Sequence, residues 1–339
     1  MKRYIAVIAA VLLILTLFTG CGNGSGKRIV RISHVQSETH PIHLGLLALE
    51  KYVEERIGDR YDVQIFPNEL LGAQVKTVEL CQTGAIDFTV ASIAIMESFD
   101  NIYEIFNLPY LFDNEEHYHA VMEDESITKP IYTSTDESGF EAVAWYDAGT
   151  RNFYTVKKEI KTPEDLKGLK IRVQQSATNV RMMELFNAAA TPMSFGEVYT
   201  ALQQNVIDGA ENNELAIVNN KHGEVAKKYS YNKHQMVPDI LIGNIKFLDS
   251  LNDGDREVFE QAFDISSKVQ RENWVKAVDE AKKEAEKMGV VFSYPDTEPF
   301  RKQVLPLHKE VLEKNEKLKK IYDAIEKKRE ELKSSNGQS

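Results

Sequence analysis

Cysteine is scarce in this 339-residue chain, which contains only Cys21 and Cys81. Two cysteines cannot form the framework of several disulfides that stabilises small secreted domains. The sequence also has no Gly-x-Ser-x-Gly, no His-Glu-x-x-His, no Walker phosphate-binding loop and no cluster of Cys and His. Each of these motifs carries a particular chemistry. We therefore expect a protein without catalytic activity, metal or cofactor.

Positive charge is also in short supply. The chain has 41 Lys and Arg against 52 Asp and Glu, a net charge of −11, and leaving out Lys2 and Arg3 of the first 20 residues makes it −13. An acidic chain without long basic runs is a poor partner for nucleic acid or anionic lipid. At 42% apolar and 27% charged residues, the composition is globular. The length suffices for about two domains.

Long apolar runs are confined to the N-terminus. A basic start, Met1–Arg3, precedes the apolar run Ile5–Phe18, and we interpret residues 1–20 as a signal peptide. Fourteen helical residues span about 21 Å, whereas the hydrocarbon core of a bilayer is about 30 Å thick. We therefore expect no membrane-spanning segment after processing.

The signal peptide ends in Leu17-Phe18-Thr19-Gly20-Cys21, which resembles a bacterial lipobox, although Phe18 departs from the usual Leu. In a lipobox the cysteine becomes lipidated, so residues 21–28 are expected to form a lipid-anchored, glycine-rich linker. The membrane would then be a partner only through this anchor. The alternative is a plain secreted protein in which Cys21 is incidental.

Short β-type segments alternate with helical ones through the remaining chain, which predicts an α/β fold. Strands are expected at 29–35, 61–66, 86–90, 141–145, 169–173 and 290–293, and helices at 41–56, 73–83, 177–188, 196–204 and 252–288. The last helix is too long for an ordinary globular domain, so it should bend or span two domains. The Lys/Glu-rich tail from Glu313 is expected to be a solvated amphipathic helix.

Two histidine pairs have a spacing that could hold a metal: His40 with His43, and His117 with His119. Neither pair has a nearby cysteine or an unusual density of acidic residues. We interpret them as surface or capping histidines.

Two arginines stand out. Arg172 lies in the apolar strand 169–173, where a guanidinium is costly to bury unless it meets an anion. Arg151 follows a glycine turn at the end of another expected strand. Two such guanidiniums could form a clamp for a carboxylate, because each offers paired N–H donors. The alternative is an internal salt bridge.

Several segments, in this order and spacing, resemble the extracytoplasmic solute-binding proteins of tripartite ATP-independent periplasmic (TRAP) transporters. They are Gly84–Phe88, Asn107–Phe112, Thr162–Val173, Thr191–Gln204 and Val206–Asn212. The resemblance extends from Arg31 to about Tyr294. It implies a two-lobed fold like that of periplasmic binding proteins, with crossing strands and a long helix spanning both lobes. The implied lobe I comprises 29–148 and 238–278, and lobe II comprises 149–237 and 279–332.

The resemblance also assigns roles to individual residues. Arg172 matches the carboxylate-binding arginine, and Arg151 matches a second arginine of the site. The remaining ligand contacts implied are Asn212, Phe195, His34 and Ser92. The alternatives are a core role for Phe195, a helix cap for Asn212 and a strand-end position without ligand contact for His34. Glu211 and His234 match a pair that supports the site without touching the ligand.

Neighbouring amides favour a polyhydroxylated acid, since each hydroxyl needs both a donor and an acceptor. Gln175 and Asn213 therefore join the expected site, and the resemblance leans to the proteins that bind hexuronates such as glucuronate or galacturonate. A C4-dicarboxylate or another carboxylate remains open. The implied function is capture of a small organic acid outside the cytoplasm and its delivery to a TRAP membrane permease. The alternatives are a ligand-sensing partner of a receptor, or an extracellular carbohydrate-processing enzyme using Asp147 and Glu211.

Overall fold

The computed structural model describes residues 26–313 and 315–336. The expected signal peptide, Cys21 and most of the linker 21–28 lie outside this part of the chain. Among the described residues, no helix combines the length and the apolar character that crossing a bilayer requires.

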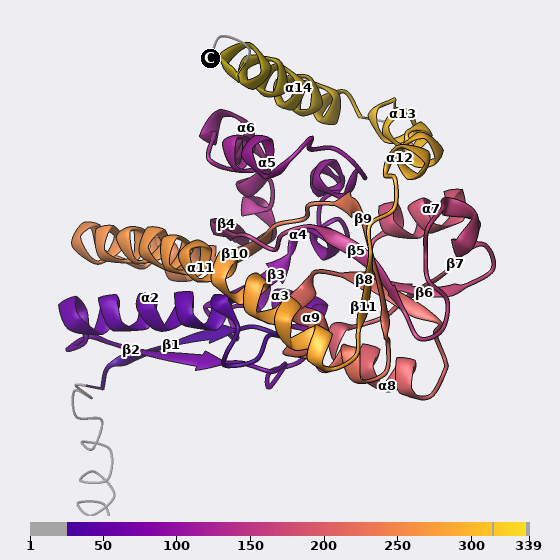
Figure 1. Ribbon diagram of the computed structural model, residues 1–339. Helices are drawn as coiled ribbons and strands as arrows, with labels where there is room; N and C mark the ends of the chain where they lie inside the picture. Colours follow the sequence, from indigo (N-terminus) through magenta and orange to yellow (C-terminus); the bar gives the residue numbers. More distant parts are fainter. Residues whose placement is uncertain (1–25, 314, 337–339) are drawn as a thin grey trace, which may run out of the picture.

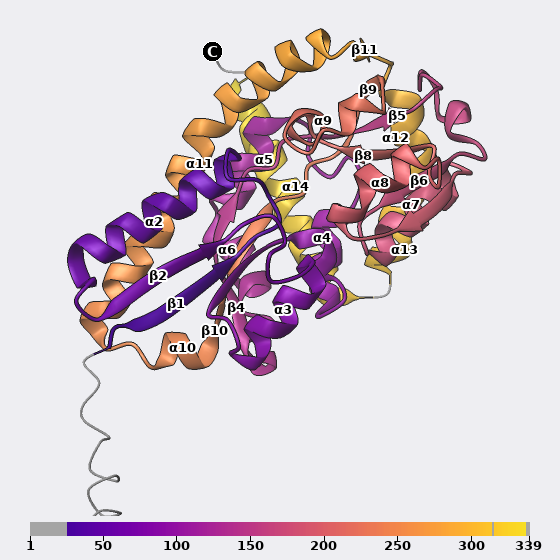
Figure 2. The same ribbon diagram turned by 90° about the horizontal axis from the view of Figure 1, so that it is seen from below.

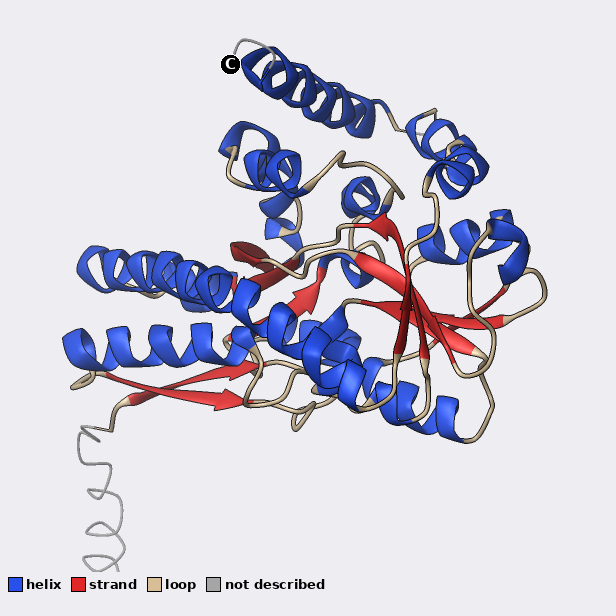
Figure 3. Ribbon diagram, in the orientation of Figure 1, coloured by secondary structure: helices blue, strands red, loops and turns tan. Residues whose placement is uncertain are grey.

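The fold contains two β-sheets with helices packed around them (Figures 1 and 3). The first sheet has the order β2-β1-β3-β10-β4. Its strands are β1 (Arg28–Ser33), β2 (Tyr61–Phe66), β3 (Phe88–Ser92), β4 (Phe140–Tyr146) and β10 (Asp239–Asn244). The strands β1, β2 and β3 are parallel, and β10 is antiparallel to both β3 and β4. Every residue of β3 and β10 is buried, as expected for strands inside a sheet covered on both faces.

The second sheet has the order β11-β9-β5-β8-β6-β7. Its strands are β5 (Arg151–Thr155), β6 (Lys170–Val173), β7 (Ala189–Pro192), β8 (Gly209–Asn212), β9 (Lys228–Gln235) and β11 (Val291–Ser293). The sequence patterns predicted β6 and β11 but missed the other four, which are short or rich in polar residues. The α/β class and the two-sheet architecture are nevertheless as predicted.

The helices before the second sheet are α2 (Pro41–Ile57), α3 (Gln74–Thr83), α4 (Ile93–Met96), α5 (Glu115–Met122) and α6 (Glu125–Tyr132). Those that follow β6 are α7 (Ala177–Leu185), α8 (Val198–Gln203), α9 (Glu214–Val218), α10 (Ile245–Asp249), α11 (Asp253–Lys287), α12 (Glu298–Val304), α13 (Pro306–Leu312) and α14 (Glu316–Asn336).

Two short connections join the sheets, from β4 to β5 and from β9 to β10, and the chain crosses a third time through α11, from β10 to β11. The expected lobe boundaries, 148/149 and 237/238, fall in these two connections. The first connection contains Gly149 at φ +61°, and a β-carbon there would lie 3.1 Å from Trp274 Cζ2. Both the left-handed backbone and the close approach of the indole therefore require glycine.

The 35-residue helix α11 is unbroken and packs on α2 and β4 of lobe I and on α9 of lobe II (Figure 2). The sequence predicted that this long segment would either bend or span two domains, and the helix spans both lobes without a break. Asn252 caps its start by accepting a hydrogen bond from the Asp255 amide.

The C-terminal helices differ from expectation. While α12 and α13 contact α7 of lobe II, α14 contacts α5 and α6 on the lobe I side (Figure 1), so residues 279–332 do not all pack with lobe II. The tail is also not simply solvated, because Leu318, Ile321 and Ile325 are buried. Their spacing places them on one helical face, which packs onto the protein while the charged residues remain outside.

Candidate functional site

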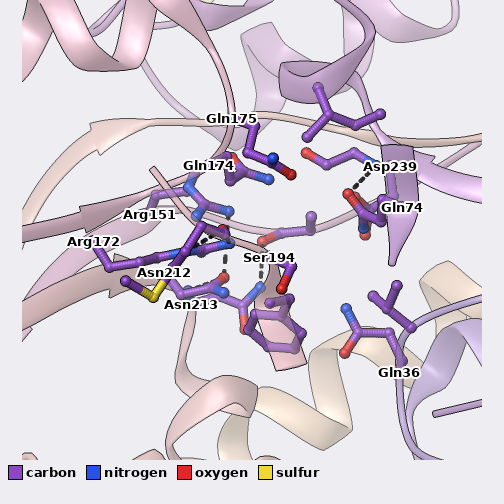
Figure 4. Close-up of a pocket in the computed structure, with 16 residues that line it drawn as sticks. Gln36, Gln74, Arg151, Arg172, Gln174, Gln175, Ser194, Asn212, Asn213 and Asp239 are labelled. Atoms are coloured by element: carbon purple, nitrogen blue, oxygen red, sulfur yellow. Dashed lines mark hydrogen bonds between the residues drawn. The ribbon is translucent and has the colours of Figure 1, made fainter. Parts of the chain in front are cut away.

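A pocket lies between the two sheets, and 16 residues from both lobes line it (Figure 4). They are Val35, Gln36, Gln74, Ser92, Ile95, Ala148, Arg151, Arg172, Gln174, Gln175, Met193, Ser194, Phe195, Asn212, Asn213 and Asp239. The empty volume, including space open to solvent, is about 530 Å³.

Arg172 projects from β6 and is only 3% exposed. Its Nε and Nη2 both donate to the Met193 carbonyl, at 3.1 and 2.9 Å, and it forms no ion pair with any described carboxylate. Burial lowers the pKa of Arg172 to about 10, although Glu211 acts in the opposite direction. A buried cation without an anionic partner on the wall of a pocket is suited to receive an anion.

Arg151 is situated differently at the start of β5. Its Nη2 donates to Glu211 Oε1 and to the Glu211 carbonyl, each at 2.9 Å, and its Nε pairs with Oε2 of the same carboxylate. Its Nη1 reaches Asn212 Oδ1 at 3.4 Å. The internal salt bridge considered for the two arginines therefore exists for Arg151 and not for Arg172.

Glu211 and His234 lie behind the pocket wall, and neither lines it. His234 Nε2 is 3.5 Å from Glu211 Oε2, and both side chains are fully buried. Burial raises the pKa of Glu211, but Arg151 and His234 reverse this, and the pKa falls to about 2. The carboxylate therefore stays charged and holds the Arg151 guanidinium in place, as expected of a supporting pair.

Two adjacent asparagines line the pocket where β8 ends. Asn212 Oδ1 accepts a hydrogen bond from the backbone N–H of Asn213 at 2.8 Å and faces Arg151. Asn213 Oδ1 accepts from Leu215 N at 3.1 Å, and its Nδ2 donates to Ala148 O at 3.0 Å. Asn213, rather than Asn212, is therefore the cap of α9.

Three further expected residues also line the pocket: Phe195, Ser92 and Gln175. Phe195 is partly buried, and its ring centroid lies 5.8 Å from the Arg172 guanidinium carbon. The ring thus contacts the core of lobe II and the pocket at once. Ser92 is buried at the end of β3, whereas Gln175 is exposed at the pocket edge.

The structure does not place His34 among the pocket-lining residues. Its Nε2 is 3.0 Å from His43 Nδ1, and burial lowers its pKa to about 3. The other histidines considered for metal binding have protein partners: His40 caps α2, and His119 pairs with Asp147 at 2.7 Å. Within the described ranges, no group of three or more His, Cys, Asp or Glu could hold a metal ion.

Sequence reasoning missed five polar residues of the pocket: Gln36, Gln74, Gln174, Ser194 and Asp239. Gln174 could have been predicted from the sequence, since it directly follows the strand that carries Arg172. Asp239 begins β10 immediately after the second crossing. An acidic residue next to the apolar run Ile240–Ile242 is a signal comparable to that of Arg172. Gln36 and Gln74 carry no such local signal because they come from a loop and a helix start.

Two carboxylates connect the lobes beside the pocket. Glu69 of lobe I accepts a hydrogen bond from Gly196 N of lobe II at 3.0 Å. Glu97 accepts from Ser176 Oγ at 2.8 Å and from Thr178 N at 3.0 Å. The lobes therefore contact one another directly around the pocket.

Arg172 is thus buried without an ionic partner among the described residues, in a pocket between two lobes. Residues 32–315 match the model of bacterial extracellular solute-binding proteins, family 7 (DctP). This chain belongs to that family. The predicted membership in the TRAP solute-binding proteins is thereby confirmed.

The solved structures that are similar to this chain include two TRAP periplasmic solute-binding proteins with a bound uronate. A TRAP periplasmic solute-binding protein from Anaerococcus prevotii, with bound α/β-D-glucuronate, is 59% identical, with a TM-score of 0.89 over 90% of this chain and 99% of that one. A Sulfitobacter protein with bound β-D-galacturonate is 30% identical, with a TM-score of 0.85 over 87% and 98%. Among curated relatives, the uncharacterized protein YiiZ of Salmonella typhimurium is 39% identical over 89% of this chain and 92% of its own length.

Proposed function

We propose that this protein captures a hexuronate, such as D-glucuronate or D-galacturonate, outside the cytoplasm and delivers it to a TRAP membrane permease. The observation that carries the proposal is Arg172, which is buried on the pocket wall without an ion pair to any described residue. A ligand carboxylate would supply the missing counter-charge through two parallel hydrogen bonds. The bound glucuronate and galacturonate in the similar structures support a hexuronate in particular.

The rest of the pocket suits a sugar ring. Phe195 offers a flat apolar face next to Arg172, against which one side of a pyranose can pack. Amide side chains, among them Gln36, Gln74 and Gln174, surround the remaining space. Amides both donate and accept hydrogen bonds, so they can satisfy several hydroxyls at once.

The proposed activity is binding without chemistry. The two acidic residues considered for an enzyme pair with other residues, Glu211 with Arg151 and Asp147 with His119. Neither lines the pocket. Incubation of the protein with glucuronate or an oligouronide should leave the substrate intact by mass spectrometry, and turnover would contradict a pure binding role.

Capture would proceed by closure of the lobes on the ligand. Arg172, Arg151 and Asn212 come from lobe II, whereas Gln74 and Ser92 come from lobe I, so only the closed form offers all contacts together. The carboxylate of Glu69 at Gly196 N would then hold the lobes together. A lipid on Cys21 would keep the loaded protein near the permease.

Calorimetric titration tests the proposal. Glucuronate or galacturonate should bind with a dissociation constant of about 1 μM or lower, equivalent to about −8 kcal/mol. Succinate should bind at least about tenfold more weakly, since closure would leave amides unpaired. Glucose should not bind, because Arg172 would stay buried without a counter-charge. Tight binding of succinate without any uronate signal would overturn the hexuronate assignment in favour of a dicarboxylate.

A further inference from the structure

Asp239 is the only carboxylate among the described residues that line the pocket. It is the first residue of β10, opposite Ser92 of β3 and Tyr146 of β4, and its exposure is 8%. Figure 4 labels it beside Gln74, on the side of the pocket away from Arg172. An acidic side chain is unexpected in a pocket built to receive an anion.

The charges around the pocket leave room for one anionic group. The only cations among its described lining residues are Arg151 and Arg172. Glu211 neutralises Arg151 through a doubly hydrogen-bonded pair, so Arg172 alone retains an uncompensated charge. One ligand carboxylate satisfies it. A second carboxylate would meet no free cation.

Asp239 is itself not neutralised, because it forms no ion pair with a described cation within 4.0 Å. Burial raises the pKa of Asp239 to about 6, and Arg151 and Ser92 act against that shift. The side chain is therefore mostly ionised at pH 7.5. An ionised carboxylate only accepts hydrogen bonds, so a hydroxyl group is a suitable partner and another carboxylate is repelled.

We propose that Asp239 determines the specificity of the site, by accepting hydrogen bonds from ligand hydroxyls and excluding a second carboxylate. The protein then selects sugar acids with one carboxylate and rejects dicarboxylated sugars as well as simple dicarboxylates. This inference rests on the proposed function. It adds that the ligand carries a single carboxylate and that Asp239 is the residue that excludes a second one. This selection by charge is distinct from the weak binding expected of succinate, which leaves the pocket amides without hydrogen-bond partners. A dicarboxylated sugar has hydroxyls for those amides, and Asp239 still rejects it.

Gluconate and glucarate form a matched pair of probes, because both are open-chain sugar acids and glucarate carries one more carboxylate. Each is used to compete with labelled glucuronate on the wild type, on Asp239→Asn and on Glu280→Gln. Asp239→Asn keeps the shape of the side chain and removes its charge. Glu280 is exposed on α11, outside the pocket, and controls for a change in net charge.

We expect Asp239→Asn to bind glucuronate about tenfold more weakly and to improve competition by glucarate, relative to gluconate, about tenfold or more. Glu280→Gln should match the wild type. A glucarate inhibition constant, corrected for the weaker binding of glucuronate, that is no lower for Asp239→Asn than for the wild type overturns the role of Asp239, whether or not gluconate competes. A wild type that does not bind glucuronate at all instead overturns the proposed function. Circular dichroism of each variant establishes that it is folded.

Discussion

Arg151 on the pocket wall forms an ion pair with Glu211 behind it, with Nη2 of the arginine 2.9 Å from Oε1 of the glutamate. Their strands β5 and β8 are antiparallel neighbours, so residues 60 positions apart in sequence meet at one edge of the pocket. Because this pair is neutral, the two arginines of the site have different tasks. Arg151 is a fixed part of the wall, and Arg172 is the charge that a ligand can satisfy.

Replacement of Arg172 should abolish ligand binding while the protein remains folded. Loss of a desolvated, charge-assisted pair costs about 2–5 kcal/mol, or about 30- to 5,000-fold in affinity. Arg172→Lys should not restore binding, because an ammonium lacks the forked donor geometry. Isothermal titration with glucuronate measures both variants. Near-normal affinity of Arg172→Ala would show that this arginine is only structural.

Replacement of Arg151 should instead destabilise the fold. Arg151→Ala would leave Glu211 charged, buried and without its cation, which costs about 3–5 kcal/mol. Arg172→Ala removes a buried charge that has no carboxylate partner, and it should cost much less. Urea denaturation of the two ligand-free variants gives the comparison. Equal losses of unfolding free energy would contradict the different roles of the two arginines.

Asp239 should make the ligand-free fold less stable as pH rises. The folded-state pKa of this residue, about 6, lies above its ordinary value of 3.8. The folded protein therefore binds more protons than the unfolded chain in this interval, and the contribution of Asp239 to stability falls as pH rises from about 4 to 6. The neighbouring cation that opposes this shift is Arg151.

Asp239→Asn removes this titration. The melting temperature of the variant minus that of the wild type should increase from pH 4 to pH 6.5 and then level off. Buried histidines such as His34 are present in both proteins, so their titration cancels in the difference. A difference that does not change over this range would show that Asp239 does not titrate as inferred.

Closure of the lobes should be reported by Trp274. This residue contacts Gly149 at the first crossing, and its ring centroid is 5.8 Å from that of His40. The other tryptophan, Trp145, packs in lobe I against Tyr118 and Arg271. Glucuronate should therefore change the fluorescence of Trp145→Phe, which retains Trp274, more than that of Trp274→Phe.

Small-angle scattering provides the matching global measurement, since closure should decrease the radius of gyration when glucuronate is saturating. Arg172→Ala at the same ligand concentration is the control. Identical scattering curves for the wild type with and without bound ligand would rule out closure.

The sequence alone determined the α/β class, the long helix 252–288 and family membership. It also singled out Arg172, because burial of a guanidinium in an apolar strand is costly wherever that strand lies, and the structure places this residue on the pocket wall. These inferences depend on interactions over a few residues or on contiguous motifs, which the order of amino acids displays directly. Four of the missed strands, β5, β7, β8 and β9, lack such a pattern, because they are short or contain polar residues. The strand β10 was missed as well, although its centre, Ile240–Ile242, is apolar.

The tertiary structure decided which groups are paired. Arg151 and Arg172 look alike in sequence, yet only the strand order brings Glu211 to Arg151 and leaves Arg172 without a carboxylate. In the same way, only packing turns His34 toward His43 and places Asp239 on the pocket wall. Charge compensation and burial depend on distances of a few ångströms between segments far apart in the chain, and these distances are set when the two sheets assemble.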